Sequence, residues 1–142
     1  MSHYNIINGN NHLDKRGLLC FFNSFDMTEI SRMYEIVPSS TETIRAWQGH
    51  KLEKKWFYCN SGSFVINLIE IDDFENPSLQ LIPSRIELSQ DNAEILEIPR
   101  GYANGFKATK ENSRLIIFSN LTLEESKNDD FRFPVEKWYS KW

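Results

Sequence analysis

The segment Ala46–His50 carries side chains suited to proton chemistry. The imidazole of His50 titrates near neutral pH, so it can act as a general acid or base when a proton moves between carbons that flank a carbonyl group. If the segment is a strand, Ala46, Gln48 and His50 share one face. Polar side chains that face the inside of a barrel need partners, because each buried unpaired group costs about 1–3 kcal/mol. A ligand pocket meets this need better than a packed core, so we favour a pocket over a histidine satisfied within the core.

Arginine, lysine and tyrosine side chains elsewhere in the chain are suited to binding a phosphorylated ligand. The guanidinium groups of Arg16 and Arg45 can each bind phosphate through two parallel hydrogen bonds, although surface salt bridges are the alternative for both. Lys55 belongs to a run of three lysines within residues 51–55, which is most simply a solvated face, and only one of the three need point inward. Tyr34 can stack on a nucleotide base or a sugar, with core or dimer packing as the alternative.

The elements around these residues are predicted to be β-strands of a single domain over residues 1–142. A chain of 142 residues with 40% hydrophobic and 25% charged residues is neither disordered nor embedded in a membrane. Thr122 and Glu125 fit a capping box at the start of one short helix. Short runs of aromatic and β-branched residues predict the strands Leu18–Phe22, Arg32–Ile36, Thr43–Trp47, Lys55–Cys59, Ser63–Ile71, Arg85–Leu88, Ala93–Ile98 and Arg114–Ser119. Such a series is typical of a sandwich or barrel.

The composition argues against several classes of partner. The net charge of −4, from 16 basic and 20 acidic residues, is unlike that of a general nucleic-acid-binding protein. No apolar run approaches the roughly 20 residues that a membrane-spanning helix needs, and the N-terminus lacks the features of a signal peptide, so we expect no membrane partner. Cys20 and Cys59 stand alone in apolar surroundings, which predicts two free thiols in a cytoplasmic protein.

Two turns resemble those of the cupin superfamily. Gly62 corresponds to the end of the first cupin motif, and Pro99-x-Gly101 to the start of the second. Cupin metal sites consist of three histidines and one glutamate. The corresponding positions here hold Gln48, His50, Lys55 and Asn104. Amides and a cation are poor ligands for a divalent metal, so we predict an all-β, cupin-type jelly-roll barrel with no metal and no other cofactor.

Nearly the whole chain resembles a narrower family within that superfamily. Asp14-Lys15-Arg16-Gly17, the segment Ile44–His50 and the turn Ile98–Phe106 are similar to motifs of the dTDP-4-dehydrorhamnose 3,5-epimerases. The short chain and the pair His50-Lys51 also resemble the dTDP-sugar 3,4-ketoisomerases. Both groups are metal-free jelly rolls that tend to form dimers. The resemblance therefore implies a homodimer that binds a nucleotide sugar.

The resemblance also implies roles for single residues. Arg16 and Arg45 correspond to arginines that hold the diphosphate of the ligand. Lys55 corresponds to a lysine near the keto oxygen of the sugar, where it would stabilise an enolate. His50 corresponds to the second histidine of the ketoisomerases and is our candidate for the general acid and base.

Other positions depart from the catalytic pattern of the family. The base histidine of the epimerases is replaced by Gln48, and the histidine of their Pro-x-Gly turn by Asn104. The tyrosine that acts as their acid has no counterpart near Ile117 or Leu123. We place Gln48 and Asn104, together with Tyr34, among the substrate-binding residues.

These observations predict a nucleotide-sugar isomerase or epimerase with His50 and Lys55 as its catalytic residues. Its substrate would be a dTDP-linked or similar keto-deoxysugar used for surface polysaccharide. The loss of the base histidine leaves an alternative open, a cupin that binds a sugar or sugar nucleotide without catalysis. A scaffold that only dimerises is a third possibility.

Overall fold

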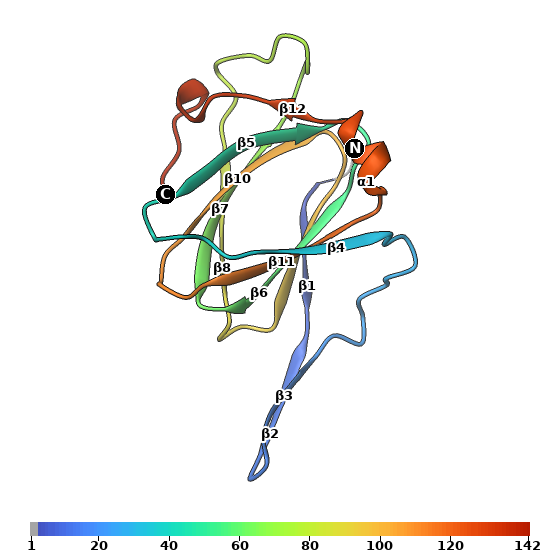
Figure 1. Cartoon of the computed structure of the whole chain (residues 1–142), viewed down its shortest axis with the longest axis vertical. Helices are drawn as coiled ribbons and strands as arrows, with labels where there is room; N and C mark the ends of the chain where they lie inside the picture. The colour runs from blue at the N-terminus through green and yellow to red at the C-terminus, as the bar shows by residue number, and fades with distance from the viewer. Residues whose placement is uncertain (1–2) are drawn as a thin grey trace.

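Two antiparallel sheets face each other in the computed structural model, which describes residues 3–142 (Figure 1). The first sheet has the strand order β1 (Asn5–Asn8), β9 (Glu94–Ile98), β6 (Lys55–Ser61), β11 (Arg114–Ser119) and β4 (Arg32–Ile36). The second has the order β12 (Phe131–Arg132), β5 (Ile44–His50), β10 (Tyr102–Ala108), β7 (Ser63–Glu70) and β8 (Ser84–Ser89). The chain crosses repeatedly between the sheets. The predicted all-β jelly roll is confirmed.

A two-stranded hairpin and a crossing segment complete the fold. The hairpin of β2 (Asn10–Asp14) and β3 (Gly17–Phe21) projects from the body of the molecule, and we call it the arm (Figure 1). Residues 120–133, which we call the strap, run from the first sheet to the second and contain α1 (Leu123–Lys127) and β12. A 3-10 turn follows at Val135–Lys137. The predicted capping box of α1 is present, because Thr122 and Glu125 exchange side-chain to backbone hydrogen bonds.

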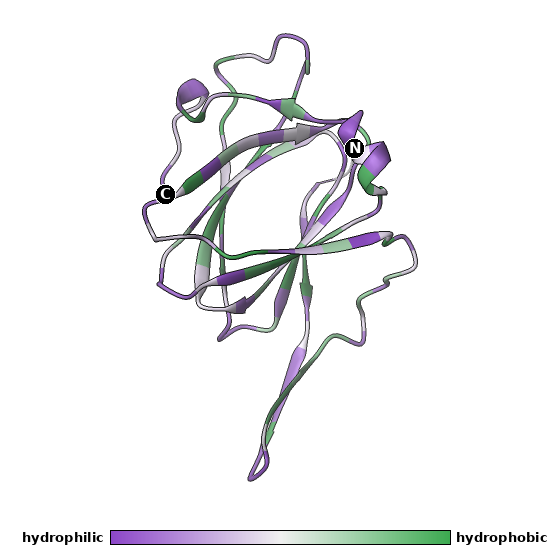
Figure 2. Ribbon diagram, in the orientation of Figure 1, coloured by the Kyte–Doolittle hydropathy of each residue, from purple (hydrophilic) through white to green (hydrophobic). Residues whose placement is uncertain are grey.

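Alternation along the strands places one apolar face of each sheet in a shared core. Figure 2 shows apolar segments within the strands of the two sheets. The core consists of Phe57, Cys59, Phe64, Ile66, Leu68, Leu88, Leu96, Ile98, Tyr102, Phe106, Ala108, Leu115 and Ile117. The core fills one part of the space between the sheets and leaves the remainder for polar side chains.

The C-terminal residues cover the second sheet. Trp138 is buried edge-on against Trp47, and its indole N–H donates to the carbonyl of Ser78 at 2.8 Å. Trp142 packs against Trp47 as well, with ring centroids 5.5 Å apart. This second apolar cluster holds β5 in place from the side opposite the main core.

Every predicted strand overlaps an observed one, but the sequence reading missed four. The strands β1, β2, β10 and β12 contain many polar or small residues, which weaken the strand signal. Both predicted glycine turns are confirmed, since Gly62 has a φ of 71° and Gly101 a φ of 91°, where other residues are strained. Among residues 3–142, no helix is long and apolar enough to span a membrane.

Candidate functional site

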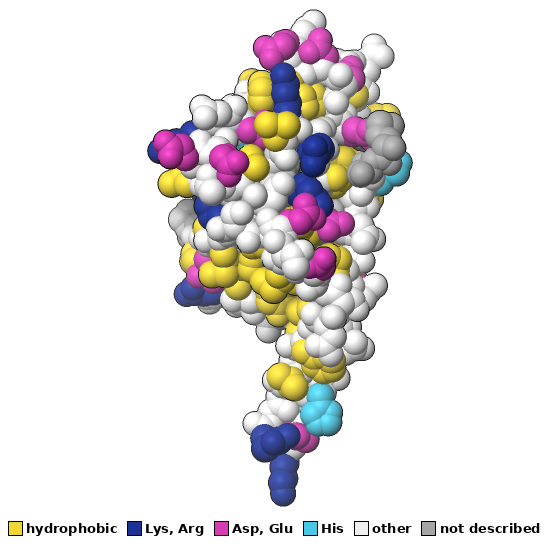
Figure 3. Space-filling model, turned by 90° about the vertical axis from the view of Figure 1, so that its right-hand side faces the viewer, with side chains coloured by type: hydrophobic (Ala, Val, Ile, Leu, Met, Phe, Trp, Pro, Cys, Tyr) yellow, Lys and Arg dark blue, Asp and Glu magenta, His cyan; other side chains and the backbone are white. Residues whose placement is uncertain are grey.

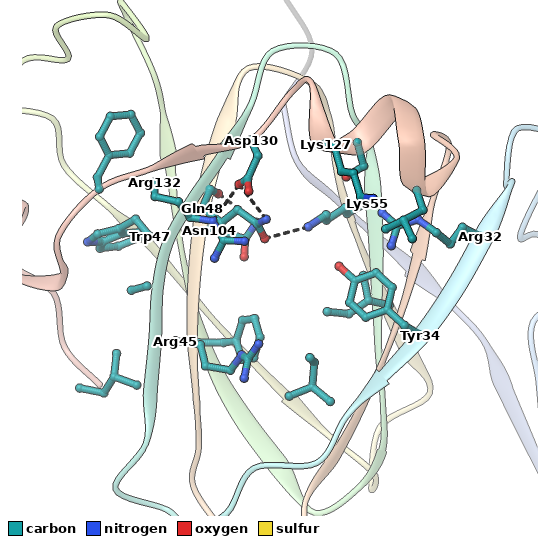
Figure 4. A pocket seen from close by; sticks show the side chains of 18 residues that line it. Arg32, Tyr34, Arg45, Trp47, Gln48, Lys55, Asn104, Lys127, Asp130 and Arg132 are labelled. Carbon is teal, nitrogen blue, oxygen red and sulfur yellow. Dashed lines mark hydrogen bonds and ion pairs between the residues drawn. The ribbon is translucent and has the colours of Figure 1, made fainter.

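A cavity of about 490 Å³ lies between the two sheets (Figure 4). Its volume is within the range of small-molecule sites. Its walls come from β4, β5, β6, β10, β11 and the strap. The polar side chains that line it are Arg32, Tyr34, Arg45, Gln48, Lys55, Asn104, Ser126, Lys127, Asp130 and Arg132.

The cavity wall is strongly cationic in a chain that is acidic overall. Five of its side chains are arginine or lysine and one is a carboxylate. Arg32 forms an ion pair with Glu53 at 3.2 Å, and Arg132 with Asp130 at 2.8 Å. In the described chain, no such ion pair involves the other three cations, Arg45, Lys55 and Lys127. The cavity therefore suits an anionic ligand.

A hydrogen-bonded chain of side chains crosses the inner end of the cavity. Lys55 Nζ donates to Gln48 Oε1 at 3.1 Å, and Gln48 Nε2 donates to Asp130 Oδ1 at 3.1 Å (Figure 4). Asp130 Oδ1 also accepts from Arg132 Nε at 2.8 Å. The amide of Asn104 donates to the backbone carbonyl of Gln48 at 3.3 Å. These bonds link β6, β5 and the strap, and they fix the orientation of the Gln48 amide.

Lys55 is a buried cation, and the predicted alternative in which it points to solvent is wrong. The residue is 4% exposed and its side chain points into the cavity (Figure 4). Burial lowers the pKa of Lys55 to about 8, while nearby Glu53 acts in the opposite direction. Lys55 Nζ also lies 5.8 Å from the ring centroid of Tyr34. Burial raises the pKa of Tyr34 to about 12, so its phenol is protonated at neutral pH.

A β-bulge in β5 places Arg45 in the cavity. Asn104 pairs with Gln48, but Phe106, two residues further along β10, pairs with Arg45, three residues back along β5. The extra residue in β5 turns the Arg45 side chain to the same face as Gln48. Simple alternation would have placed these two side chains on opposite faces.

His50 shares the inner face of β5 but is not among the residues that line the cavity. It is 3% exposed, and its Nδ1 lies 2.6 Å from the carbonyl oxygen of Asp129. A carbonyl oxygen only accepts, so Nδ1 carries the proton in the neutral ring and Nε2 keeps its lone pair. Among the described residues, Nε2 has no hydrogen-bond partner. Burial, followed by the charge of Lys55, lowers the pKa of His50.

His50, Glu53 and Asp129 form a buried cluster that could be mistaken for a metal site. The Asp129 carboxylate accepts three backbone N–H bonds, from residues 51, 52 and 53, at 2.8–2.9 Å. The Glu53 carboxylate accepts from Ser119, Ser126 and Arg32. Because protein donors already occupy these oxygens, the cluster is better explained as a structural network that joins the strap to the β5–β6 turn.

Arg16 lies at the tip of the arm and does not line the cavity. Its side chain is 82% exposed and pairs with Asp14 at 2.7 Å. The structure thus brings together Tyr34, Arg45, Gln48, Lys55 and Asn104, but neither Arg16 nor His50 joins them within one chain.

Comparisons with known proteins agree with this architecture. No protein-family model and no curated protein matches the sequence. The 3,4-ketoisomerase QdtA from Thermoanaerobacterium thermosaccharolyticum, a double mutant in complex with TDP, is 24% identical with a TM-score of 0.71, over 94% of this chain and 89% of that one. The TDP-quinovose 3,4-ketoisomerase WlaRB from Campylobacter jejuni is 20% identical with a TM-score of 0.69, over 94% and 95%. The dTDP-4-dehydrorhamnose 3,5-epimerase from Bacillus anthracis, with TDP and PPi bound, is 15% identical with a TM-score of 0.77, over 94% and 79%.

This chain has the fold of these sugar-nucleotide ketoisomerases and epimerases. The fold predicted from the resembling motifs is thereby confirmed.

Sequence reasoning missed four charged residues of the cavity, Arg32, Lys127, Asp130 and Arg132. Arg32 could have been predicted, because it precedes Tyr34 by two residues and therefore shares its face of β4. The other three lie on the strap, and nothing in the sequence indicates that this segment returns to the cavity.

Proposed function

We propose that the chain binds a nucleotide-diphosphate-linked keto-deoxysugar in the cavity and isomerises or epimerises it. The single observation that carries the proposal is the cationic cavity between the sheets, which holds three basic side chains without an acidic partner among the described residues. Solved structures with this fold contain TDP or TDP-4-keto-6-deoxyglucose, which supports the same ligand class here. Surface polysaccharide synthesis is the pathway we infer, and two free thiols, Cys20 and Cys59, are consistent with a cytoplasmic location.

The proposed binding roles follow from position. Arg45 enters from β5 with no ion-pair partner in the described chain and contributes to binding the diphosphate. Tyr34 offers an aromatic face, and Gln48 and Asn104 offer amide groups to sugar hydroxyls. The predicted role of Lys55 as a cation that stabilises a developing enolate oxygen stays a prediction. The predicted acid–base role of His50 stays a prediction, supported by the free lone pair of its Nε2 and opposed by its position outside the cavity.

Proton exchange at the sugar tests the enzymatic proposal. The chain is incubated with TDP-4-keto-6-deoxyglucose in deuterated water. Proton NMR follows the signals of the protons on the carbons beside the keto group. We expect those signals to disappear with time as deuterium replaces the protons. Ligand binding without any exchange, for this sugar and for related keto-sugar nucleotides, would overturn the enzymatic proposal.

A non-catalytic binding protein is the second candidate. The Gln48 amide favours it, because an amide cannot act as a base and its two polar groups are already bonded to Lys55 and Asp130. Under this alternative TDP raises the melting temperature of the chain while no exchange occurs at any pH. A chain that only dimerises would show neither effect.

We also propose a homodimer in which the arm contacts a second copy. Leu13, Leu18 and Leu19 on the arm are 60–75% exposed, and an isolated two-stranded hairpin is only marginally stable in water. Figure 3 shows apolar side chains on the arm and basic side chains at its tip. In such a dimer the Arg16 of one chain would reach the cavity of the other, which reconciles its predicted role in diphosphate binding with its distance from its own cavity.

Two changes on the arm test the dimer. Leu13 and Leu18 face each other across the hairpin. We expect the double variant Leu13→Lys, Leu18→Lys to sediment as a monomer while the original chain sediments as a dimer. Ile82→Lys, at a loop residue that is 86% exposed, is the matched control and should leave the dimer intact. A monomeric original chain, or a dimer unaffected by the arm variant, would contradict this proposal.

A further inference from the structure

Lys55 is buried at the inner end of the cavity without a carboxylate partner. Its Nζ donates to one neutral acceptor, Gln48 Oε1, and no ion pair within residues 3–142 involves it. A buried cation without a paired anion destabilises the fold. An apolar side chain would be more stable at this position, so the amine is better explained by chemistry than by structure.

Asp130 and Tyr34, two other titratable side chains of the cavity, are less suited to take a proton from carbon. Burial acts to raise the pKa of Asp130, but hydrogen bonds from Arg132 and Gln48 outweigh it and lower that pKa, which leaves a weakly basic carboxylate. The Tyr34 phenol already carries its proton. His50 lies outside the cavity wall.

We propose that the Lys55 amine is the base that removes the proton from the carbon beside the keto group of the substrate. The inference rests on the proposed function. In it, the Lys55 amine takes the place of the imidazole that position 48 lacks. The nitrogen lone pair forms a new N–H bond, the C–H electron pair becomes the C=C bond of an enolate, and the carbonyl electrons move to oxygen. Return of the proton to carbon regenerates the amine and the ketone, so no other reactant is consumed.

The groups around Lys55 determine the pH range in which its amine is neutral and can act as a base. The charged and titratable groups around it come from β4, β5, the β5–β6 turn and the strap: Arg32, Tyr34, His50, Glu53, Asp130 and Arg132. Burial, Arg32 and Arg132 favour the neutral amine, whereas Glu53 and Asp130 favour the ammonium. With a pKa of about 8, the amine is mostly charged at pH 7 and mostly neutral at pH 9. The exchange rate should therefore rise with pH through about 8 and then level off.

Two variants separate proton transfer from a fixed positive charge. Lys55→Arg keeps the charge but cannot lose its proton at any working pH. Lys55→Ala removes the amine and leaves space for an added primary amine. We expect both variants to lower the deuterium exchange rate of TDP-4-keto-6-deoxyglucose by about a hundredfold or more, the usual contribution of a general base. Ethylamine and propylamine should restore exchange in Lys55→Ala in proportion to the free amine, and TDP affinity should change far less than the rate.

The outcomes distinguish this inference from the function on which it rests. No exchange by the original chain would contradict the proposed function itself. If the Lys55→Arg variant still catalyses exchange, the inference is overturned, because a fixed cation would then be enough for catalysis. Loss of exchange in His50→Asn, with Lys55→Ala still active, would return the role to His50 and also overturn it. Lys51→Ala and Lys51→Arg change a half-exposed lysine that does not line the cavity, and both should exchange like the original chain.

Discussion

Replacing Gln48 with histidine is expected to raise the rate of deuterium exchange into TDP-4-keto-6-deoxyglucose by about a hundredfold at pH 6.5–7. Position 48 corresponds to the base histidine of the epimerases that the sequence resembles, and its side chain faces the cavity. Asp130 Oδ1 already accepts a hydrogen bond from this side chain at 3.1 Å. An imidazole there would donate one N–H to Asp130 and present its other nitrogen to the ligand, the arrangement that orients a catalytic histidine.

The pH dependence and a second variant make this prediction specific. The added activity should follow the titration of an imidazole and so appear at lower pH than the activity assigned to Lys55. Adding Asp130→Asn should remove most of the gain, because the imidazole then lacks its orienting carboxylate. A Gln48→His variant that folds and binds TDP but exchanges no faster than the original chain would show that position 48 does not face the reacting carbons.

Replacing Lys55 with methionine is expected to stabilise the fold at pH 7 by about 2 kcal/mol. A pKa of about 8, against an ordinary value of 10.5, corresponds to about 3 kcal/mol of unfavourable free energy for the buried ammonium. The hydrogen bond to Gln48 Oε1 offsets about 1 kcal/mol of this. Chemical denaturation at pH 7 should therefore give a higher free energy of unfolding for the variant, although its activity is lost.

The direction in which stability changes with pH follows from the pKa of Lys55 in the folded chain and its ordinary pKa in the unfolded chain. The unfolded chain holds the Lys55 proton more tightly than the folded chain, so the original protein gains stability as pH rises from about 8 to 10.5. The advantage of Lys55→Met should shrink over that range. Lys51→Met, at a lysine whose side chain is 47% exposed, is the control and should change stability by less than about 1 kcal/mol. Destabilisation by Lys55→Met at pH 7 would mean that the buried charge is compensated.

Local patterns were sufficient to predict most of the fold. Short runs of aromatic and β-branched residues identified the core strands, and the glycines at positions 62 and 101 marked turns that demand a positive φ. The motifs around Arg45 and Asn104 located one wall of the cavity, since β5 and β10 are neighbours in the second sheet. The family resemblance, rather than the lysine run itself, placed Lys55 near the ligand, and its side chain does line the cavity.

Long-range contacts explain what the sequence did not predict. The bulge that turns Arg45 inward exists only in the pairing of β5 with β10. The strap brings Asp130 to Gln48 across 82 positions of sequence, and no local pattern reports that contact. The position of His50 depends on the same segment, because Asp129 fixes both its ring and the turn that follows it.

Calorimetric titration with TDP tests most directly the claim that the cavity is a nucleotide-sugar site. We predict saturable binding with one TDP for each cavity. Arg45→Ala should weaken that binding by tenfold or more, because a hydrogen bond to a charged group contributes about 1.5–3 kcal/mol. Arg85→Ala, which removes an arginine outside the cavity wall, should bind TDP like the original chain. Absence of binding, or equal affinity in the Arg45 variant and the original chain, would contradict the account.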